Sequence, residues 1–149
     1  MEWMLLPFRR YAEFSGRSRR KEYWMFALLM VIVYALGGLL MFSSIWPAVT
    51  AGGTAAWENL TPAFWAGAII LGLFTLAIIV PGIAVTIRRL HDRDMSGWWY
   101  LGVVILGQVP YLGPLVNLGF LVLMALPGTP GANRFGPDPK DPLNAEVFA

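Results

Sequence analysis

The stretch Tyr23–Trp57, YWMFALLMVIVYALGGLLMFSSIWPAVTAGGTAAW, decides the fold class. It contains no Asp, Glu, Lys or Arg, and a second stretch, residues 59–87, contains none either. Each stretch is longer than the roughly 20 apolar residues with which an α-helix crosses about 30 Å of hydrocarbon. The sequence therefore predicts an all-α membrane protein with two long spanning helices.

The composition supports this class and argues against others. Of the 149 residues, 57% are hydrophobic and only 13% are charged, whereas about a quarter of a typical soluble domain is charged. A formal net charge of +2 argues against a nucleic-acid partner. The absence of cysteine excludes disulfides, thiolate zinc sites and cysteine nucleophiles. We predict one membrane domain over residues 1–149.

Aromatic residues and prolines set the expected bounds of the helices. Trp24 and Trp46 lie about 33 Å apart along a helix, which places one indole at each headgroup level, and Pro47 is expected to end that helix. The two long helices are thus predicted at about residues 22–46 and 63–89.

A third uncharged stretch, residues 95–133, is interrupted by Pro110, Gly113 and Pro114. It predicts a hairpin of two short helices at about residues 96–109 and 115–127, which makes a polytopic bundle of four helices. Short helices either cross as tilted spans in a thinned bilayer or form a re-entrant hairpin. Of the two alternatives we favour two short crossings.

The basic residues predict the orientation. None lies between the two long helices or in the hairpin turn, so the positive-inside rule places both termini and the loop 88–94 in the cytoplasm, an N-in/C-in topology. The eleven cations fall before the first helix (Arg9, Arg10, Arg17, Arg19, Arg20, Lys21), around the end of the second (Arg88, Arg89, Arg93) and after the hairpin (Arg134, Lys140).

The two terminal segments are expected to lie outside the bilayer. Phe8, Tyr11 and Phe14 recur at helical spacing in residues 1–17, which predicts a short helix that either lies in the headgroup plane or packs on the cytoplasmic helix ends. Residues 128–149 are rich in Pro and Gly, which predicts a cytoplasmic tail without helix or strand. We expect the tail to fold back through Asn133 and Arg134.

The segment from residue 88 to residue 99, RRLHDRDMSGWW, is the most informative in the chain, because it holds three Arg, two Asp and the one His of the sequence. This segment has four possible roles. It could bind lipid phosphate, hold a metal ion, carry out acid–base chemistry or form a purely structural loop. A metal site would have three ligands at most, and acid–base chemistry would lack a nucleophile. We therefore predict no catalytic residue, no metal and no cofactor, and a structural network with Ser96 as a helix cap: His91, Asp92, Arg93, Asp94, Ser96, Trp98 and Trp99.

Cations near the start of the first helix and the end of the second would meet on one membrane face if those helices are neighbours. Each cation near an anionic surface contributes about 1 kcal/mol. The candidate contacts to anionic lipid headgroups are therefore Arg17, Arg19, Arg20, Lys21, Arg88 and Arg89.

Three motifs together resemble a known family. They are FSGRSRRKEYW at residues 14–24, RRLHD at 88–92 with SGWW at 96–99, and GANRFGPDP at 131–139. In this order they resemble the small bacterial inner-membrane proteins of the YhaH/YhaI type, domain-of-unknown-function family 805. The resemblance implies a multi-pass protein of the bacterial inner membrane and carries over no catalytic residue.

The charge-free spans also bear on function, because ionisable residues within spans usually mark transport or proton paths. We expect a non-enzymatic accessory or scaffolding subunit of a membrane complex. The alternatives are a protein that binds anionic lipid and a small oligomeric channel or transport component. The expected partners are membrane lipids and either further copies of the chain or a larger membrane complex.

Overall fold

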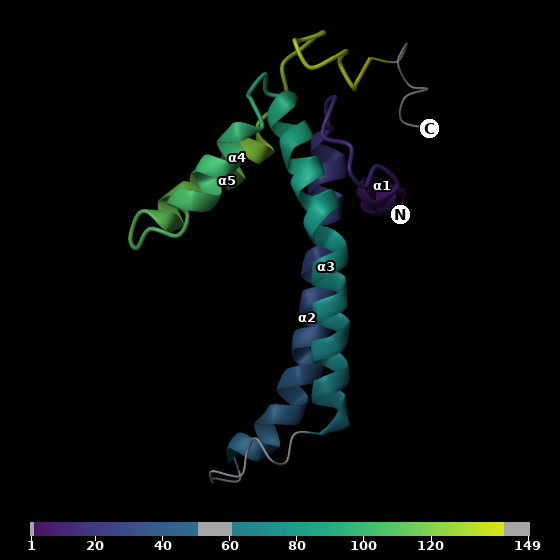
Figure 1. The fold of residues 1–149 in the computed structure, drawn as a ribbon, viewed down its shortest axis with the longest axis vertical. Helices are drawn as coiled ribbons and strands as arrows, with labels where there is room; N and C mark the ends of the chain where they lie inside the picture. Colours follow the sequence, from purple (N-terminus) through teal and green to yellow (C-terminus); the bar gives the residue numbers. More distant parts are fainter. Residues whose placement is uncertain (1, 51–60, 142–149) are drawn as a thin grey trace. The chain divides into compact units, whose positions relative to one another are not determined.

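Five α-helices follow one another in the computed structural model, which describes residues 2–50 and 61–141 (Figure 1). Between these helices and after them, the described residues contain one isolated bridge, Asn133 with Gly136, and no strand. The all-α prediction is therefore confirmed. The helices are α1 (Glu2–Arg9), α2 (Arg20–Thr50), α3 (Pro62–His91), α4 (Trp98–Leu106) and α5 (Gly113–Ala125).

Helices α2 and α3 are the two long helices expected from the uncharged stretches. Both are long and apolar enough to cross a membrane, over Arg20–Pro47 and Pro62–His91. The prediction that Pro47 ends the first of them is wrong, because α2 continues through Pro47 to Thr50. A proline removes one helical hydrogen bond, and Ser or Thr hydroxyls nearby can bond to the carbonyls around it. Within the last turn of α2, the Thr50 hydroxyl donates to the carbonyls of Trp46 and Pro47.

Helix α4 is shorter than predicted, whereas α5 has its predicted length and is shifted toward the N-terminus. Helix α4 ends at Leu106 rather than near residue 109, and α5 begins at Gly113 because Pro114 occupies its first turn, a position that proline favours. Helix α5 ends before Leu126, which is extended (ψ 152°), as expected of a residue that precedes a proline. Figure 1 shows α4 and α5 side by side, joined by a short turn.

The N-terminal helix is also shorter than its predicted segment. Helix α1 ends at Arg9, so Tyr11 and Phe14 do not continue the helical spacing. Pro7 is buried, and the Phe8 ring packs edge-on against Phe26 with centroids 5.5 Å apart. Contact with the start of α2 is therefore one role of α1. Its place relative to a membrane stays a prediction.

The chain divides into two compact units, one made of residues 1–26 and 80–149 and the other of residues 27–79. In the second unit, α2 and α3 pack antiparallel. The Tyr34 hydroxyl lies 2.8 Å from the Thr75 hydroxyl, and the Thr61 hydroxyl donates to that of Ser44 at 2.8 Å. The prediction of a single domain stays a prediction.

Glycines allow this close packing within the second unit. A Cβ atom on Gly37 would lie 2.5 Å from the Leu71 side chain, whereas one on the adjacent Gly38 would meet nothing within 4 Å. Two glycines of α3 differ in the same way: Gly67 faces Met41, and Gly72 faces open space.

Gly37 and Gly38 make a matched pair for a test of this packing. We expect Gly37→Leu to lower the free energy of unfolding by about 1–3 kcal/mol, because overpacking forces neighbours apart. We expect Gly38→Leu to leave it unchanged or raise it slightly, since leucine favours helix over glycine. Unfolding in detergent–denaturant mixtures measures both, and equal losses would contradict the packing described.

Candidate functional site

Five charged side chains are buried together in the first unit, and we call them the ion-pair cluster. They come from the segment before α2, the first turn of α2, the last turns of α3 and the loop after α3. Buried charges are costly unless they are paired and hydrogen-bonded. The cluster consists of Arg17, Glu22, Arg88, Arg89 and Asp92, each at most 4% exposed.

Asp92 lies between two arginines. Its Oδ1 atom accepts a hydrogen bond from Arg17 Nε at 3.0 Å and lies 2.9 Å from Arg17 Nη2, and its Oδ2 atom pairs with Arg89. The backbone carbonyl of Asp92 accepts the Thr129 N–H at 2.8 Å. One residue thus connects the segment before α2, the end of α3 and the tail.

The other donors of the two arginines go to backbone carbonyls. Arg17 donates to the carbonyls of Thr129 and Gly131, both at 2.6 Å. Arg89 donates to the carbonyl of Met124 at 3.1 Å and to that of Leu126. Carbonyls at a helix C-terminus have no partner within the helix, so Arg89 caps α5 and Arg17 holds the tail.

Gly128 shows how tightly the tail lies on the cluster. A Cβ atom at this position would lie 2.0 Å from Asp92 Oδ2 and 2.8 Å from Asp92 Oδ1. No residue other than glycine can occupy position 128 without displacing the carboxylate that pairs with both arginines.

Glu22 and Arg88 form the second buried pair. Their Oε1 and Nη1 atoms lie 2.9 Å apart, and both side chains are fully buried. The Ser18 hydroxyl donates to Glu22 Oε2 at 2.8 Å, and the Ser18 N–H donates to the Arg88 carbonyl at 3.1 Å. The start of α2 is therefore joined to the end of α3 by side-chain and backbone contacts.

Arg10 and Glu13 make a more exposed pair in the segment after α1. Arg10 donates two hydrogen bonds of 2.6 Å to the Glu13 carboxylate. These bonds hold the pKa of the Glu13 carboxyl below its usual value. The Glu13 side chain is 42% exposed, so this pair stabilises the fold less than the buried pairs do.

His91 and Asn133 dock the tail on the loop after α3. The His91 Nδ1 atom donates to the Gly16 carbonyl at 3.1 Å, which requires a proton on that nitrogen because a carbonyl only accepts. The His91 ring stacks on Phe135 with centroids 3.9 Å apart. Asn133 Nδ2 donates to the His91 carbonyl at 2.9 Å and to the Thr129 hydroxyl at 3.0 Å.

The rest of the predicted loop network lies nearer the surface. Arg93 donates to the Pro127 carbonyl, and Asp94 pairs with Arg134 at 3.2 Å. The prediction that Ser96 caps the next helix is wrong: Gly97 takes the N-cap position, and Ser96 Oγ accepts only a 3.4 Å hydrogen bond from the N–H of the first helical residue. That residue, Trp98, is 79% exposed, and Trp99 is 61% exposed.

Three of the six candidate lipid contacts, Arg17, Arg88 and Arg89, lie in the ion-pair cluster. The other three are nearer the surface: Arg19 donates to the Pro139 carbonyl, Arg20 is exposed and donates to the Ala125 carbonyl at 3.2 Å, and the Lys21 ammonium lies over the Trp3 ring, 5.2 Å from its centroid. Contact with lipid headgroups stays a prediction, now centred on Arg20 and Lys21.

The ion-pair cluster is suited to holding segments of the chain together, because its polar groups are directed at one another. Both Asp92 oxygens face arginines, and the Ser18 hydroxyl is buried and donates to Glu22. Over residues 2–50 and 61–141, no group of three His, Asp or Glu side chains is arranged to hold a metal ion. The arrangement fixes the tail, the loop and two helix ends to one another.

Sequence reasoning missed the role of Glu22. Its pairing with Arg88 brings together residues far apart in the chain, and the signal that could have found it is a lone acid among the cations of residues 17–21. The carbonyl acceptors at 124–131 carry no sequence signal, because every residue has a carbonyl.

Known proteins are similar to this chain over nearly its whole length. The family described as "Protein of unknown function (DUF805)" matches residues 11–137, which contain the complete ion-pair cluster. The chain is 39% identical to the inner membrane protein YhaH of Escherichia coli K12 and 38% identical to the inner membrane protein YhaI of the same strain. The two alignments cover 94% of this chain and 98% and 97% of those relatives. No solved structure matches the chain.

Proposed function

The chain belongs to the DUF805 family, and from this premise we propose that it is a non-enzymatic accessory or scaffolding subunit of a complex in the bacterial inner membrane, with both termini in the cytoplasm. The names of the relatives support a location in the inner membrane, and two helices that are long and apolar enough to cross a membrane are consistent with it.

The exposed surface of the α4–α5 hairpin is the observation that carries the proposal. Helix α4 has no buried residue, and α5 buries only Gly113 and Met124. Apolar side chains such as Leu115 (66% exposed) and Leu118 (60%) therefore cover both helices. Exposed apolar surface of this extent is typical of protein–protein or membrane contact.

The length of the hairpin favours protein contact in addition to lipid. Helices of 9 and 13 residues extend about 14 and 20 Å, well short of about 30 Å of hydrocarbon. The sequence favours two short crossings for the hairpin, but these observed lengths favour the re-entrant alternative instead, in which a neighbouring protein covers part of the apolar surface. The ion-pair cluster would keep the hairpin and tail in place for that neighbour.

Site-specific photo-cross-linking tests the proposal. A photoreactive side chain at Leu115 or Leu118 should cross-link to one and the same membrane protein in the host cell. The same group at Arg134, an exposed position of the tail, is the control and should not. Cross-links only to lipid would contradict the proposal, and cross-links only to further copies of the chain would favour an oligomeric channel.

The topology gives a prediction of its own, which the lack of native cysteine makes easy to test. A membrane-impermeant maleimide should label Gly53→Cys, between α2 and α3, in intact cells with a permeabilised outer membrane. It should label Arg134→Cys only after lysis, because the tail is cytoplasmic. Tyr111→Cys, at a position 95% exposed in the hairpin turn, should also need lysis if the hairpin is re-entrant. Labelling of Arg134→Cys before lysis would contradict the N-in/C-in topology.

Binding of anionic lipid is a second candidate function, favoured by a hollow of about 350 Å³ beside the first turn of α2. Arg20, Lys21 and Trp24 line it together with Met25 and Ala125, a combination of cations and an indole suited to a lipid phosphate. Native mass spectrometry should show retained phosphatidylglycerol that Arg20→Gln with Lys21→Gln reduces and Lys140→Gln does not. Equal retention in all three proteins would contradict it.

A further inference from the structure

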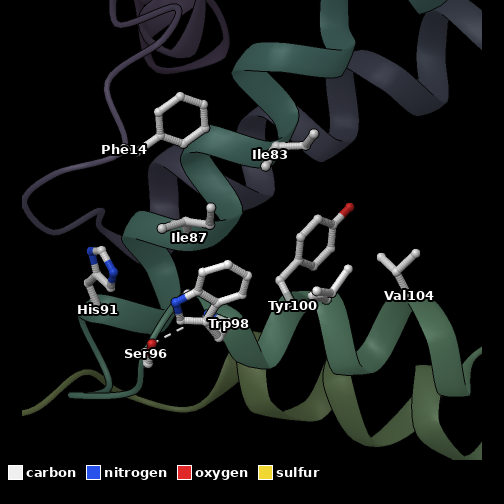
Figure 2. Close-up of a pocket in the computed structure, with 10 residues that line it drawn as sticks. Phe14, Ile83, Ile87, His91, Ser96, Trp98, Tyr100 and Val104 are labelled. Atoms are coloured by element: carbon white, nitrogen blue, oxygen red, sulfur yellow. Dashed lines mark hydrogen bonds between the residues drawn. The ribbon is translucent and has the colours of Figure 1, made fainter.

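A groove of about 670 Å³ lies within the first unit, between the end of α3 and α4 (Figure 2). On α3 it is lined by Ile83, Ile87 and His91, which lie one turn apart on one helix face. Its volume is in the range of pockets that hold a small organic ligand. The ion-pair cluster does not line it, so the groove is separate from the contacts that hold the fold together.

The groove is polar at one end and mostly apolar elsewhere, apart from the hydroxyl of Tyr100 toward the other end. Figure 2 shows His91 and Ser96 at one end, beside the loop that joins the two helices, and Val104 at the other. From Ile83 to His91 the lining extends over eight residues of α3, about 12 Å. Among the described residues, no Asp, Glu, Lys or Arg side chain lines the groove, so its walls suit the apolar part of a ligand.

We propose that this groove holds one acyl chain of a membrane phospholipid, with the headgroup at the His91–Ser96 end. The walls suit a hydrocarbon chain, because an apolar cavity holds water poorly and takes up apolar molecules instead.

The surroundings of the groove favour a lipid over other apolar ligands. Ile83 and Ile87 belong to the helix segment that is apolar enough to span a membrane. Trp98, at the polar end, is 79% exposed, and exposed indoles favour the headgroup level. The groove therefore begins where headgroups are expected and extends toward the hydrocarbon, in the same direction as a lipid molecule.

Neighbouring positions on α4 give a matched pair of variants. Val104 lines the groove and is 43% exposed, whereas Ile105 does not line it and is 59% exposed. Val104→Trp places an indole in the groove, and Ile105→Trp adds the same side chain outside it. We expect native mass spectrometry after extensive detergent washing to show one more retained phospholipid on the wild type and on Ile105→Trp than on Val104→Trp.

A labelled lipid locates the bound chain without any substitution. Wild-type protein is reconstituted with phosphatidylethanolamine that carries a diazirine at the end of one acyl chain, washed in detergent and then irradiated. The label should appear on peptides that contain residues 83–87 and 101–104. This experiment does not depend on any variant, so it remains informative if Val104→Trp fails to fold. In that case Ile83→Phe replaces Val104→Trp in the retention measurement.

Several outcomes would overturn the proposal. Absence of retained phospholipid on the wild type, equal retention by Val104→Trp and Ile105→Trp, or label confined to other peptides would each do so. An isoprenoid quinone retained in place of phospholipid, or a second copy of the chain cross-linked at Val104, would assign the groove to a different occupant. None of these results bears on the protein partner proposed for Leu115 and Leu118.

Discussion

Asp92→Asn is expected to lower the free energy of unfolding by about 3–5 kcal/mol, the usual cost of removing one partner from a buried ion pair. The amide would keep the volume of the side chain but not its charge, so Arg17 and Arg89 would remain buried without a counter-charge. The tail should detach in the same variant, because Arg17 also holds the carbonyls of Thr129 and Gly131. Denaturant titration in mixed micelles measures the first effect and proteolysis of the tail measures the second.

Asp94→Asn is the matched control. Asp94 pairs with Arg134, and their side chains are 47% and 60% exposed, so loss of this pair should change stability by no more than about 1 kcal/mol. Asp94 also has a φ of 58°, a conformation that asparagine adopts readily. Equal losses in the two variants would show that burial of the Asp92 pairs does not stabilise the protein.

Glu22→Gln should have an effect of similar size, about 3–5 kcal/mol, by the same mechanism. Arg88 is fully buried, and Glu22 is the acid with which it pairs. The Nε and Nη2 atoms of Arg88 have no hydrogen-bond partner in the described structure, so the ionic contact with Glu22 is what offsets the burial of the guanidinium. The loss should appear as a lower free energy of unfolding in mixed micelles.

Glu13→Gln is the matched control for Glu22→Gln, because it also removes an acid from the N-terminal part of the chain. Glu13 pairs with Arg10 but its side chain is 42% exposed, so the loss should stay near or below 1 kcal/mol. If Glu22→Gln were as mild as Glu13→Gln, the Glu22–Arg88 pair would not be what joins the start of α2 to the end of α3.

The sequence predicted the helices better than their ends. Absence of charge over residues 23–57 and 59–87 is a strong signal for two long apolar helices, and both are present as α2 and α3. The ends depend on single prolines, whose effect is set by position. Pro47 lies within the last turn of α2, and Pro114 begins α5 instead of belonging to the turn before it.

The ion-pair cluster was predictable only in part. The charged segment 88–94 indicated a polar site, and its arginines were expected to meet the cations of residues 17–21 if the two long helices are neighbours. Which acid pairs with which arginine depends on tertiary contacts: Arg88 pairs with Glu22, whereas the adjacent Arg89 pairs with Asp92. Neighbouring residues on a helix point in different directions, and composition does not show which neighbour each one meets.

The mass of the intact particle in native lipid tests the proposed accessory role most directly. The tagged chain, expressed at its natural level, is extracted from the host membrane with its surrounding lipid and weighed by native mass spectrometry. We expect one particle of fixed composition that contains this 16.5 kDa chain together with a second, different membrane protein in constant ratio. A particle that contains only lipid and this chain, whether as one copy or several, would contradict it.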